Sequence, residues 1–275
     1  MPVKKKKSDT KRVFLKKGAC SHTLFYILNR EFGYIKNNEE SAADPLAGGI
    51  AQEGYQCGML WGAALGAGAE SFRRHEDIGK AISHTITATQ HILESFVNRA
   101  KSPNCSAITS CDFNSKFGLT KFFVMGKPIV CLNLADKWAP EAIESAKAGL
   151  AEQPEDLPQA PISCASEVVK KMGACSEEIV MVAGFAGGYG LSGNACGALS
   201  AAIWMKTLSR VKQQNYKYTL SDPYLEKIKE AFFEITDYKM ECRKICGQKF
   251  STINEHTEFI KNGGCSKLIE ALAQV

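Results

Sequence analysis

The stretch AGGIAQEGYQCGMLWGA at residues 47–63 returns as AGGYGLSGNACGALSAA at residues 186–202, at an offset of 139 and without a gap. Ordinary composition predicts about one chance match over such a length. Eight positions are in fact identical, namely Ala47, Gly48, Gly49, Gly54, Cys57, Gly58, Leu60 and Ala63 with their counterparts. This self-similarity indicates that the chain is a tandem duplication of one module.

The other cysteines extend the repeat over both halves, with offsets that drift from 144 to 134 as small loop differences would produce. Cys111, Cys175 and Cys246 have no strict counterpart, and we expect Cys175 to be structural. Each half therefore carries four matched cysteines. The pairs are Cys20 with Cys164, Cys57 with Cys196, Cys105 with Cys242 and Cys131 with Cys265.

The pattern of apolar residues is helical in both halves. It predicts helices at residues 21–32, 58–72, 75–100, 139–151, 165–172, 176–186, 197–211 and 222–242. Residues 122–132 could instead form an extended loop or a hairpin that turns at Gly126-Lys127-Pro128. The sequence predicts an all-α protein of two homologous helical modules related by a pseudo-two-fold axis. We place the modules at residues 18–150 and 162–275, joined by a proline-containing linker at residues 151–161.

The net charge of +5 comes from the first 17 residues, which hold eight basic residues and one acid. We expect a disordered, solubilising tail there, or alternatively an arm that docks on an acidic redox partner or a membrane surface. The remainder is not basic, so no nucleic-acid partner is expected. Neither a secretory pattern nor an apolar run of membrane-span length is present, so we expect a cytoplasmic protein without a membrane span.

Eleven cysteines are many for a protein in a reducing compartment, where metal binding or redox chemistry is the leading use of thiols. Four thiolates per module suit a [2Fe–2S] or [4Fe–4S] cluster, or a tetrahedral zinc ion. No CxxC pair occurs, and the ligands are spread over about 110 residues, which favours a cluster held between helices. The alternative is that all eight are ordinary buried thiols.

The glycine-rich loop precedes a cysteine at the predicted start of a helix. A thiol there faces free backbone N–H groups and the positive end of the helix dipole, so we expect lowered pKa values for Cys57 and Cys196. Glycines also allow the backbone to approach an inorganic centre closely, although tight helix packing would explain them too. The candidate cofactor-binding glycines are Gly48, Gly49, Gly54, Gly58, Gly187, Gly188, Gly193 and Gly197.

Two further thiols, Cys111 and Cys246, lie close in sequence to Cys105 and Cys242. Cys242 and Cys246 are four residues apart, so on a helix they would share one face. They could be auxiliary ligands or a redox pair, and incidental burial is the alternative.

These residues resemble the family named C_GCAxxG_C_C, whose members are described as redox-active. The second half offers Cys164, the glycine-rich run, CGALSAA, CRKICG from Cys242 and CSKLIEAL from Cys265; the first half offers Cys20, CGMLWGA, Cys105 and Cys131. Met59 and Ala201 depart from the motif, which affects packing more than ligation. The family is similar to the non-haem part of split-Soret cytochromes, where an iron–sulfur centre is found, and the absence of CxxCH implies a haem-free relative.

The sequence thus predicts an iron–sulfur protein for electron transfer, with a cluster on the four matched cysteines of each module and a redox protein as partner. Whether it is an enzyme, and whether it forms a homo-oligomer, is left open. The alternatives are a metal-free thiol–disulfide oxidoreductase or redox sensor, and a zinc-stabilised binding protein.

Overall fold

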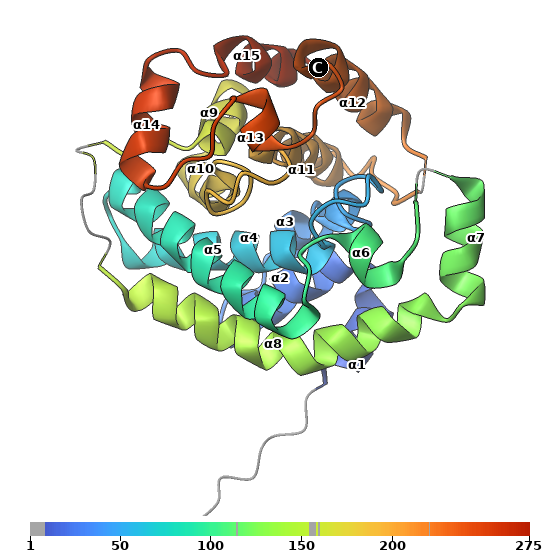
Figure 1. Ribbon diagram of the computed structural model, residues 1–275. Coiled ribbons are helices and arrows are strands. Elements are labelled where there is room, and N and C mark those ends of the chain that lie inside the picture. The colour runs from blue at the N-terminus through green and yellow to red at the C-terminus, as the bar shows by residue number, and fades with distance from the viewer. Residues whose placement is uncertain (1–8, 114, 154–157, 159, 220) are drawn as a thin grey trace, which may run out of the picture.

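The computed structural model describes residues 9–113, 115–153, 158, 160–219 and 221–275. Within these residues the only β-type pairings are two isolated bridges, and the secondary structure is otherwise helical (Figure 1). Module 1 holds α2 (Cys20–Glu31), α3 (Asn37–Ser41), η1 (Asp44–Leu46), α4 (Gly58–Arg74), α5 (Ile78–Ala100), α6 (Cys105–Thr109), α7 (Lys116–Val124) and α8 (Lys127–Ala151). Module 2 holds α9 (Cys164–Lys171), α10 (Ser176–Met181), η2 (Ala183–Phe185), α11 (Gly197–Lys212), α12 (Pro223–Thr236), α13 (Cys242–Ile245), α14 (Ile253–Lys261) and α15 (Ser266–Gln274).

The duplication is present in the backbone hydrogen bonds as well as in the sequence. The Cys57 N–H donates to the Pro103 carbonyl at 2.7 Å, and the Cys196 N–H donates to the Met240 carbonyl at 2.9 Å. The isolated bridge between Gln56 and Asn104 likewise has its counterpart between residues 195 and 241. The two halves are therefore one fold used twice, as the repeat predicts.

The two modules exchange equivalent contacts across their interface. Helix α4 packs on α2 of its own module and on α10 of module 2, while α11 packs on α9 and on α3 of module 1. Because α3 and α10 occupy corresponding places in the repeat, this reciprocity is the arrangement that a two-fold axis produces. In Figure 1 the blue-to-green module accordingly lies against the yellow-to-red one, with α4 and α11 in the interior.

Aromatic and small side chains make the interface a continuous hydrophobic core. Trp61 on α4 packs edge-to-face against Phe185 at 4.7 Å and Tyr189 at 5.1 Å between ring centroids. An added Cβ at Gly68 would lie 2.6 Å from the Met181 Cα, so glycine is what allows α4 and α10 to approach so closely. Buried side chains of both modules therefore belong to one shared hydrophobic core.

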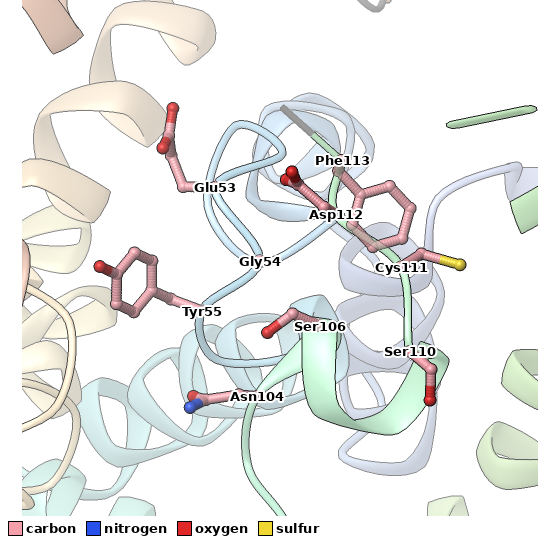
Figure 2. A pocket seen from close by; sticks show the side chains of 9 residues that line it. All are labelled: Glu53, Gly54, Tyr55, Asn104, Ser106, Ser110, Cys111, Asp112 and Phe113. Carbon is pink, nitrogen blue, oxygen red and sulfur yellow. The ribbon is translucent and has the colours of Figure 1, made fainter. Parts of the chain in front are cut away.

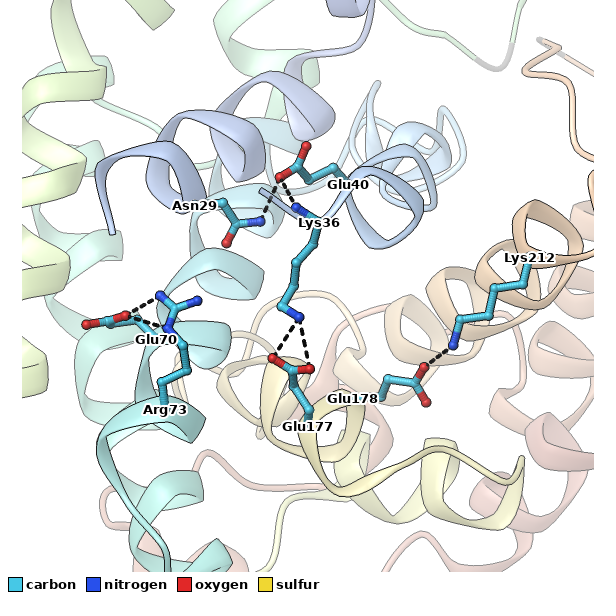
Figure 3. Close-up of polar contacts among 8 residues, drawn as sticks. All are labelled: Asn29, Lys36, Glu40, Glu70, Arg73, Glu177, Glu178 and Lys212. Carbon is cyan, nitrogen blue, oxygen red and sulfur yellow. Dashed lines mark hydrogen bonds and ion pairs between the residues drawn. The ribbon is translucent and has the colours of Figure 1, made fainter. Parts of the chain in front are cut away.

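Polar contacts also cross the interface at defined places. Figure 3 shows the ion pair between Lys36 and Glu177, whose atoms are 2.9 Å apart. The Trp204 indole N–H donates to the Glu39 carbonyl at 3.1 Å, and the Tyr189 hydroxyl donates to the Leu60 carbonyl at 2.6 Å. These bonds satisfy buried polar groups that the packing of the two modules removes from water.

The basic N-terminal segment is not disordered throughout, which corrects the expectation for residues 1–17. Residues 1–8 lie outside the described residues, but Thr10–Lys17 form helix α1. Its buried residue Val13 packs into the core, and α1 lies against α2 and α8. Arg30 also pairs with Asp9 at 2.8 Å. The segment is ordered by its apolar face and by ion pairs, since Lys17 also pairs with the buried Glu40 at 3.6 Å.

Residues 122–132 are helical, which corrects the predicted hairpin or extended loop. Met125 caps the end of α7, Gly126 with φ of +63° is the N-cap of α8, and Pro128 lies in the first turn of α8. The turn signal is therefore at the predicted place, but it joins α7 to α8. Pro140 lies inside α8, not in the first turn of a helix. No single helix in the described ranges is long and apolar enough to cross a membrane; α7 and α8 taken together meet those criteria but are bent by 66°.

The predicted helix at residues 222–242 ends earlier, at Thr236. Asp237 and Tyr238 adopt left-handed backbone conformations with φ of 52° and 57°, which an α-helix cannot continue. This break frees Cys242 to begin α13. The predicted linker falls partly on residues outside the described part of the chain; helix α8 ends at Ala151, and α9 begins at Cys164.

Candidate functional site: two cysteine clusters

The first two cysteines of each module are placed at helix N-termini that lie side by side. Cys20 is the first residue of α2, and Cys57 is the N-cap of α4. Cys164 and Cys196 take the same positions on α9 and α11. An added Cβ at Gly58 would lie only 2.6 Å from the Cys20 sulfur. The glycine of the Cys-Gly pair therefore makes room for the neighbouring thiol in module 1.

The glycine-rich loops direct backbone groups at the opening cysteine of each module. The backbone of Gly48 hydrogen-bonds the Cys20 thiol, and the backbone of Gly187 does the same to Cys164. Both glycines have positive φ, +72° and +58°, which a residue with a Cβ adopts only with strain. Gly48 also lines the cavity of module 1 and Gly197 that of module 2. The remaining positive-φ glycines of the predicted set turn the loops; they are Gly49, Gly54, Gly188 and Gly193.

In module 1 the four matched cysteines line one cavity of about 250 Å³. A single water needs only ~10–15 Å³ measured in this way, so this cavity has room for a much larger group. Its other walls are mostly apolar and come from α1, α7 and the start of α8. The lining includes Cys20, Cys57, Cys105, Cys131, Phe14, Phe113, Leu119, Phe122, Phe123, Pro128 and Tyr218.

In module 2 the four matched cysteines also converge, but on a cavity of only about 10 Å³. A fifth thiol, Cys246, stands among them. Its sulfur lies 3.7 Å from the Cys242 sulfur and 3.6 Å from the Cys265 sulfur. Cys164 and Cys196 complete the lining together with Phe250 and Phe259. The two modules therefore share a set of donors and differ in the space between them.

The pKa values of these thiols correct the expectation of low pKa at Cys57 and Cys196. The hydrogen bond with Cys20, with burial and the neighbouring thiols, raises the pKa of Cys57 well above its usual value. Burial and the Cys164 thiol raise the pKa of Cys196, although N–H groups of α11 act in the opposite direction. In both cases burial among other thiols outweighs the helix N-terminus.

Cys20 is the exception in module 1. The hydrogen bond with Cys57 and the backbone of Gly48 lower the pKa of Cys20 in spite of its burial. Burial raises the pKa of Cys131 to about 12, and burial likewise raises the pKa of Cys164 to about 12. Several buried thiols that face one another therefore resist ionisation together, unless a cation lies between them.

The three unmatched cysteines have different surroundings. Cys246 belongs to the cluster of module 2. Cys175 is exposed at the N-cap of α10 and lies outside both clusters. Cys111 is buried, and its thiol donates to the Thr109 carbonyl at 3.4 Å. Burial and the Cys20 thiol raise the pKa values of Cys105 and Cys131, and the Cys111 thiol raises both of them further.

Cys111 also lines a second, polar pocket of about 540 Å³ (Figure 2). This pocket is bordered by Glu53, Tyr55, Asn104, Ser106 and Asp112 among others, and Phe113 lines both it and the cysteine cavity. In module 2 the corresponding space beside Gly193 is taken by side chains of Arg243 and Lys249.

Motif analysis missed the residues that close the cavity of module 1. Phe122 and Phe123 lie on a segment that we expected to be extended, and Tyr218 reaches the cavity from the connection between α11 and α12 of module 2. That connection is longer than its counterpart in module 1, which joins α4 to α5. This difference in length is the sequence feature that could have indicated a special role for the segment around Tyr218. Within the described residues, no three Cys, His, Asp or Glu side chains converge as they do around a single metal ion.

The fold and the two clusters define a duplicated, all-helical, cysteine-rich protein. A protein-family model described as "Putative redox-active protein (C_GCAxxG_C_C)" matches residues 19–140 and again residues 162–275, one match for each module. The chain therefore belongs to this redox-active family and carries its module twice. No curated protein matches the chain. No solved structure matches it either.

Proposed function

We propose that the protein is an iron–sulfur redox protein and that Cys20, Cys57, Cys105 and Cys131 of module 1 are the cluster ligands. One observation carries the proposal: four cysteines from four different helices line a single, mostly apolar cavity of about 250 Å³. Thiolate sets of this composition hold [2Fe–2S] and [4Fe–4S] clusters in proteins. The separation of these cysteines along the chain explains why no compact ligand motif occurs.

The residues around the cavity fit such a group in three ways. The thiols resist ionisation in each other's presence, and a cationic centre removes that resistance because it stabilises every thiolate at once. The backbone of Gly48 is directed at the Cys20 sulfur, as expected of a group that tunes a cluster ligand. The side chains of Phe14, Phe113 and Phe122 make the cavity wall mostly apolar. A bound cluster would supply one-electron redox chemistry.

Module 2 offers the same four donors, so we extend the proposal to a second cluster on Cys164, Cys196, Cys242 and Cys265. Its cavity of about 10 Å³ must open on loading.

We propose further that electrons are exchanged with a partner protein at helix α7, in the cytoplasm. Phe123 lines the cavity and is 61% exposed, so its side chain joins the site to the surface. Phe117, Val124 and Met125 are exposed beside it. An exposed apolar patch of this kind is typical of an interaction surface.

Anaerobic purification tests the proposal. We expect a coloured protein whose broad visible absorption is bleached by dithionite, with iron and acid-labile sulfide in equal amounts. Cys57→Ser should remove the cluster of module 1 and Cys196→Ser that of module 2, so each should lower the iron content by about half if both modules load. The control, Cys175→Ser, should retain all of it, because Cys175 lies outside both clusters.

A colourless, iron-free protein with stoichiometric zinc would contradict the proposal and support the zinc-stabilised alternative. Loss of iron from Cys196→Ser alone would place the cluster in module 2 and not in module 1.

A further inference from the structure

Module 2 contains a row of three sulfur atoms for which module 1 shows no equivalent in its described residues. Cys242 begins the one-turn helix α13, Cys246 caps the end of that helix, and Cys265 is the N-cap of α15. The Cys246 sulfur contacts both of the others, at 3.7 Å and 3.6 Å. Cys111, the nearest analogue in module 1, has its thiol on the Thr109 carbonyl.

The surroundings of Cys246 allow a covalent bond to form. A disulfide needs its sulfurs ~2.05 Å apart, so either pair must move closer by about 1.6 Å. Helix α13 is only four residues long, and residues 247–249 after it are exposed. A Cβ added at Gly247 would meet no atom within 4 Å, so the chain has room to move there. Cys246 and Cys265 are partly exposed, so a small reagent can reach them.

We infer that module 2 is a thiol–disulfide centre in which Cys246 is the central thiol and forms a disulfide with Cys265 or Cys242, using a low-molecular-mass disulfide as oxidant. The Cys246 thiolate attacks one sulfur of the small disulfide, which forms a mixed disulfide and releases one small thiol. The sulfur of Cys265 or Cys242 then attacks the Cys246 sulfur and releases the second small thiol. The protein loses two electrons and two protons, and the small disulfide gains them and becomes two small thiols.

This activity does not depend on the proposed function, because it requires only thiols. Cys246 is not one of the four matched donors, whereas Cys242 and Cys265 are. A disulfide in module 2 and a cluster on its matched cysteines therefore exclude each other. Module 1 keeps its four donors in either state, since none of its cysteines takes part.

The test uses the full-length protein, prepared iron-free and reduced, then equilibrated in glutathione buffers of increasing oxidised fraction. Remaining thiols are alkylated and the peptides are mapped by mass spectrometry. We expect a disulfide from Cys246 to Cys265 or Cys242 that retains no glutathione. The exposed Cys175, which lies outside both clusters, should carry only a mixed disulfide with glutathione. The double variant Cys242→Ser/Cys265→Ser should trap glutathione on Cys246 and slow its release at least tenfold.

The inference is overturned if Cys246 stays alkylated as a free thiol in a buffer that already modifies Cys175. It is equally overturned if Cys246→Ser forms as much disulfide in module 2 as the unchanged protein does. The wild-type map decides the matter even if the double variant fails to fold. Iron and sulfide analysis of the anaerobically purified protein is a separate measurement, so failure of the cluster proposal and failure of this inference can be told apart.

Discussion

Cys20 and Cys57 are neighbouring thiols whose pKa values are shifted in opposite directions. Their side chains hydrogen-bond each other, and the backbone of Gly48 adds a bond to Cys20 alone. The pKa of Cys20 is therefore lowered and that of Cys57 is raised. The hydrogen bond between the two thiols is the largest cause of both shifts and acts in opposite directions on the two residues. Backbone groups of Gly48 and of the first residues of α2 also lower the pKa of Cys20, whereas burial and the neighbouring thiols raise the pKa of Cys57 further.

We predict that Cys20 reacts faster with iodoacetamide at pH 7 than Cys131 in the iron-free, reduced protein. The thiolate is the reactive form, and its fraction at a given pH rises as the pKa falls. Because the pKa of Cys20 is lowered, its rate should level off at a lower pH than the rate of a cysteine with the ordinary pKa. The pKa of Cys131 is raised to about 12, so its rate should still increase at pH 10.

Quantitative mass spectrometry of the two peptides between pH 6 and pH 10 measures this. Both residues are partly exposed and line the same cavity, so access is closely matched. Equal rates for the two thiols across the range would contradict a lowered pKa at Cys20 and a raised pKa at Cys131.

At the level of elements, the glycine-rich loops of the two modules are joined by one side chain. Gln56 is fully buried, its amide nitrogen donates to the Gly188 carbonyl at 3.3 Å, and its amide oxygen accepts from the Ala195 N–H at 3.2 Å. Gln56 precedes Cys57 and Ala195 precedes Cys196, so these are equivalent positions of the repeat. The pseudo-two-fold symmetry is broken here, because one position carries a bridging side chain and the other a methyl group.

We predict that Gln56→Leu destabilises the protein by about 1–3 kcal/mol, since it leaves the buried Ala195 N–H without its partner, whereas the Gly188 carbonyl still accepts from the Ser192 hydroxyl at 2.6 Å. Urea unfolding followed by circular dichroism measures the change. The matched control is Gln248→Leu at an exposed position of module 2, where the change should stay within ~0.5 kcal/mol. An unchanged midpoint for Gln56→Leu would mean that the bridge contributes nothing to the association of the loops.

At the level of the whole molecule, the two modules share a hydrophobic core. Phe25 and Trp61 of module 1 belong to the same buried cluster as Phe185, Trp204 and Leu272 of module 2. The polar linker contributes no residue to this cluster among those described. The halves are therefore held together by shared packing and by polar contacts as well as by the covalent connection.

We predict that cutting the linker leaves the halves together. A protease site placed within residues 152–160 should yield two fragments that separate on a denaturing gel but elute as one species from a size-exclusion column. Each half expressed alone should be insoluble or unfolded, because it would expose the interface around Trp61 or Phe185 to water. Elution of two independent folded halves after cleavage would contradict a shared core.

Much of the architecture could be predicted from the sequence, because a duplicated chain shows each helix pattern and each cysteine position twice. The helical class, the two modules and most helix positions follow from apolar periodicity, and the matched cysteines were found by register alone. The signals failed where tertiary contacts decide. Residues 122–132 have the composition of a strand but form helices, and residues 10–17 are highly charged yet fold because Val13 reaches the core.

The sequence by itself determined the repeat, the fold class and the eight cysteines that belong to two equivalent sets, since these are properties of spacing and composition. Only the tertiary structure decided what each set encloses. In module 1 residues of α7 and Tyr218 line a cavity of about 250 Å³ together with the four cysteines, whereas the Cys246 sulfur contacts those of Cys242 and Cys265 in module 2 and the cavity there is about 10 Å³. Space between side chains depends on elements that are remote in sequence, and no local pattern records it.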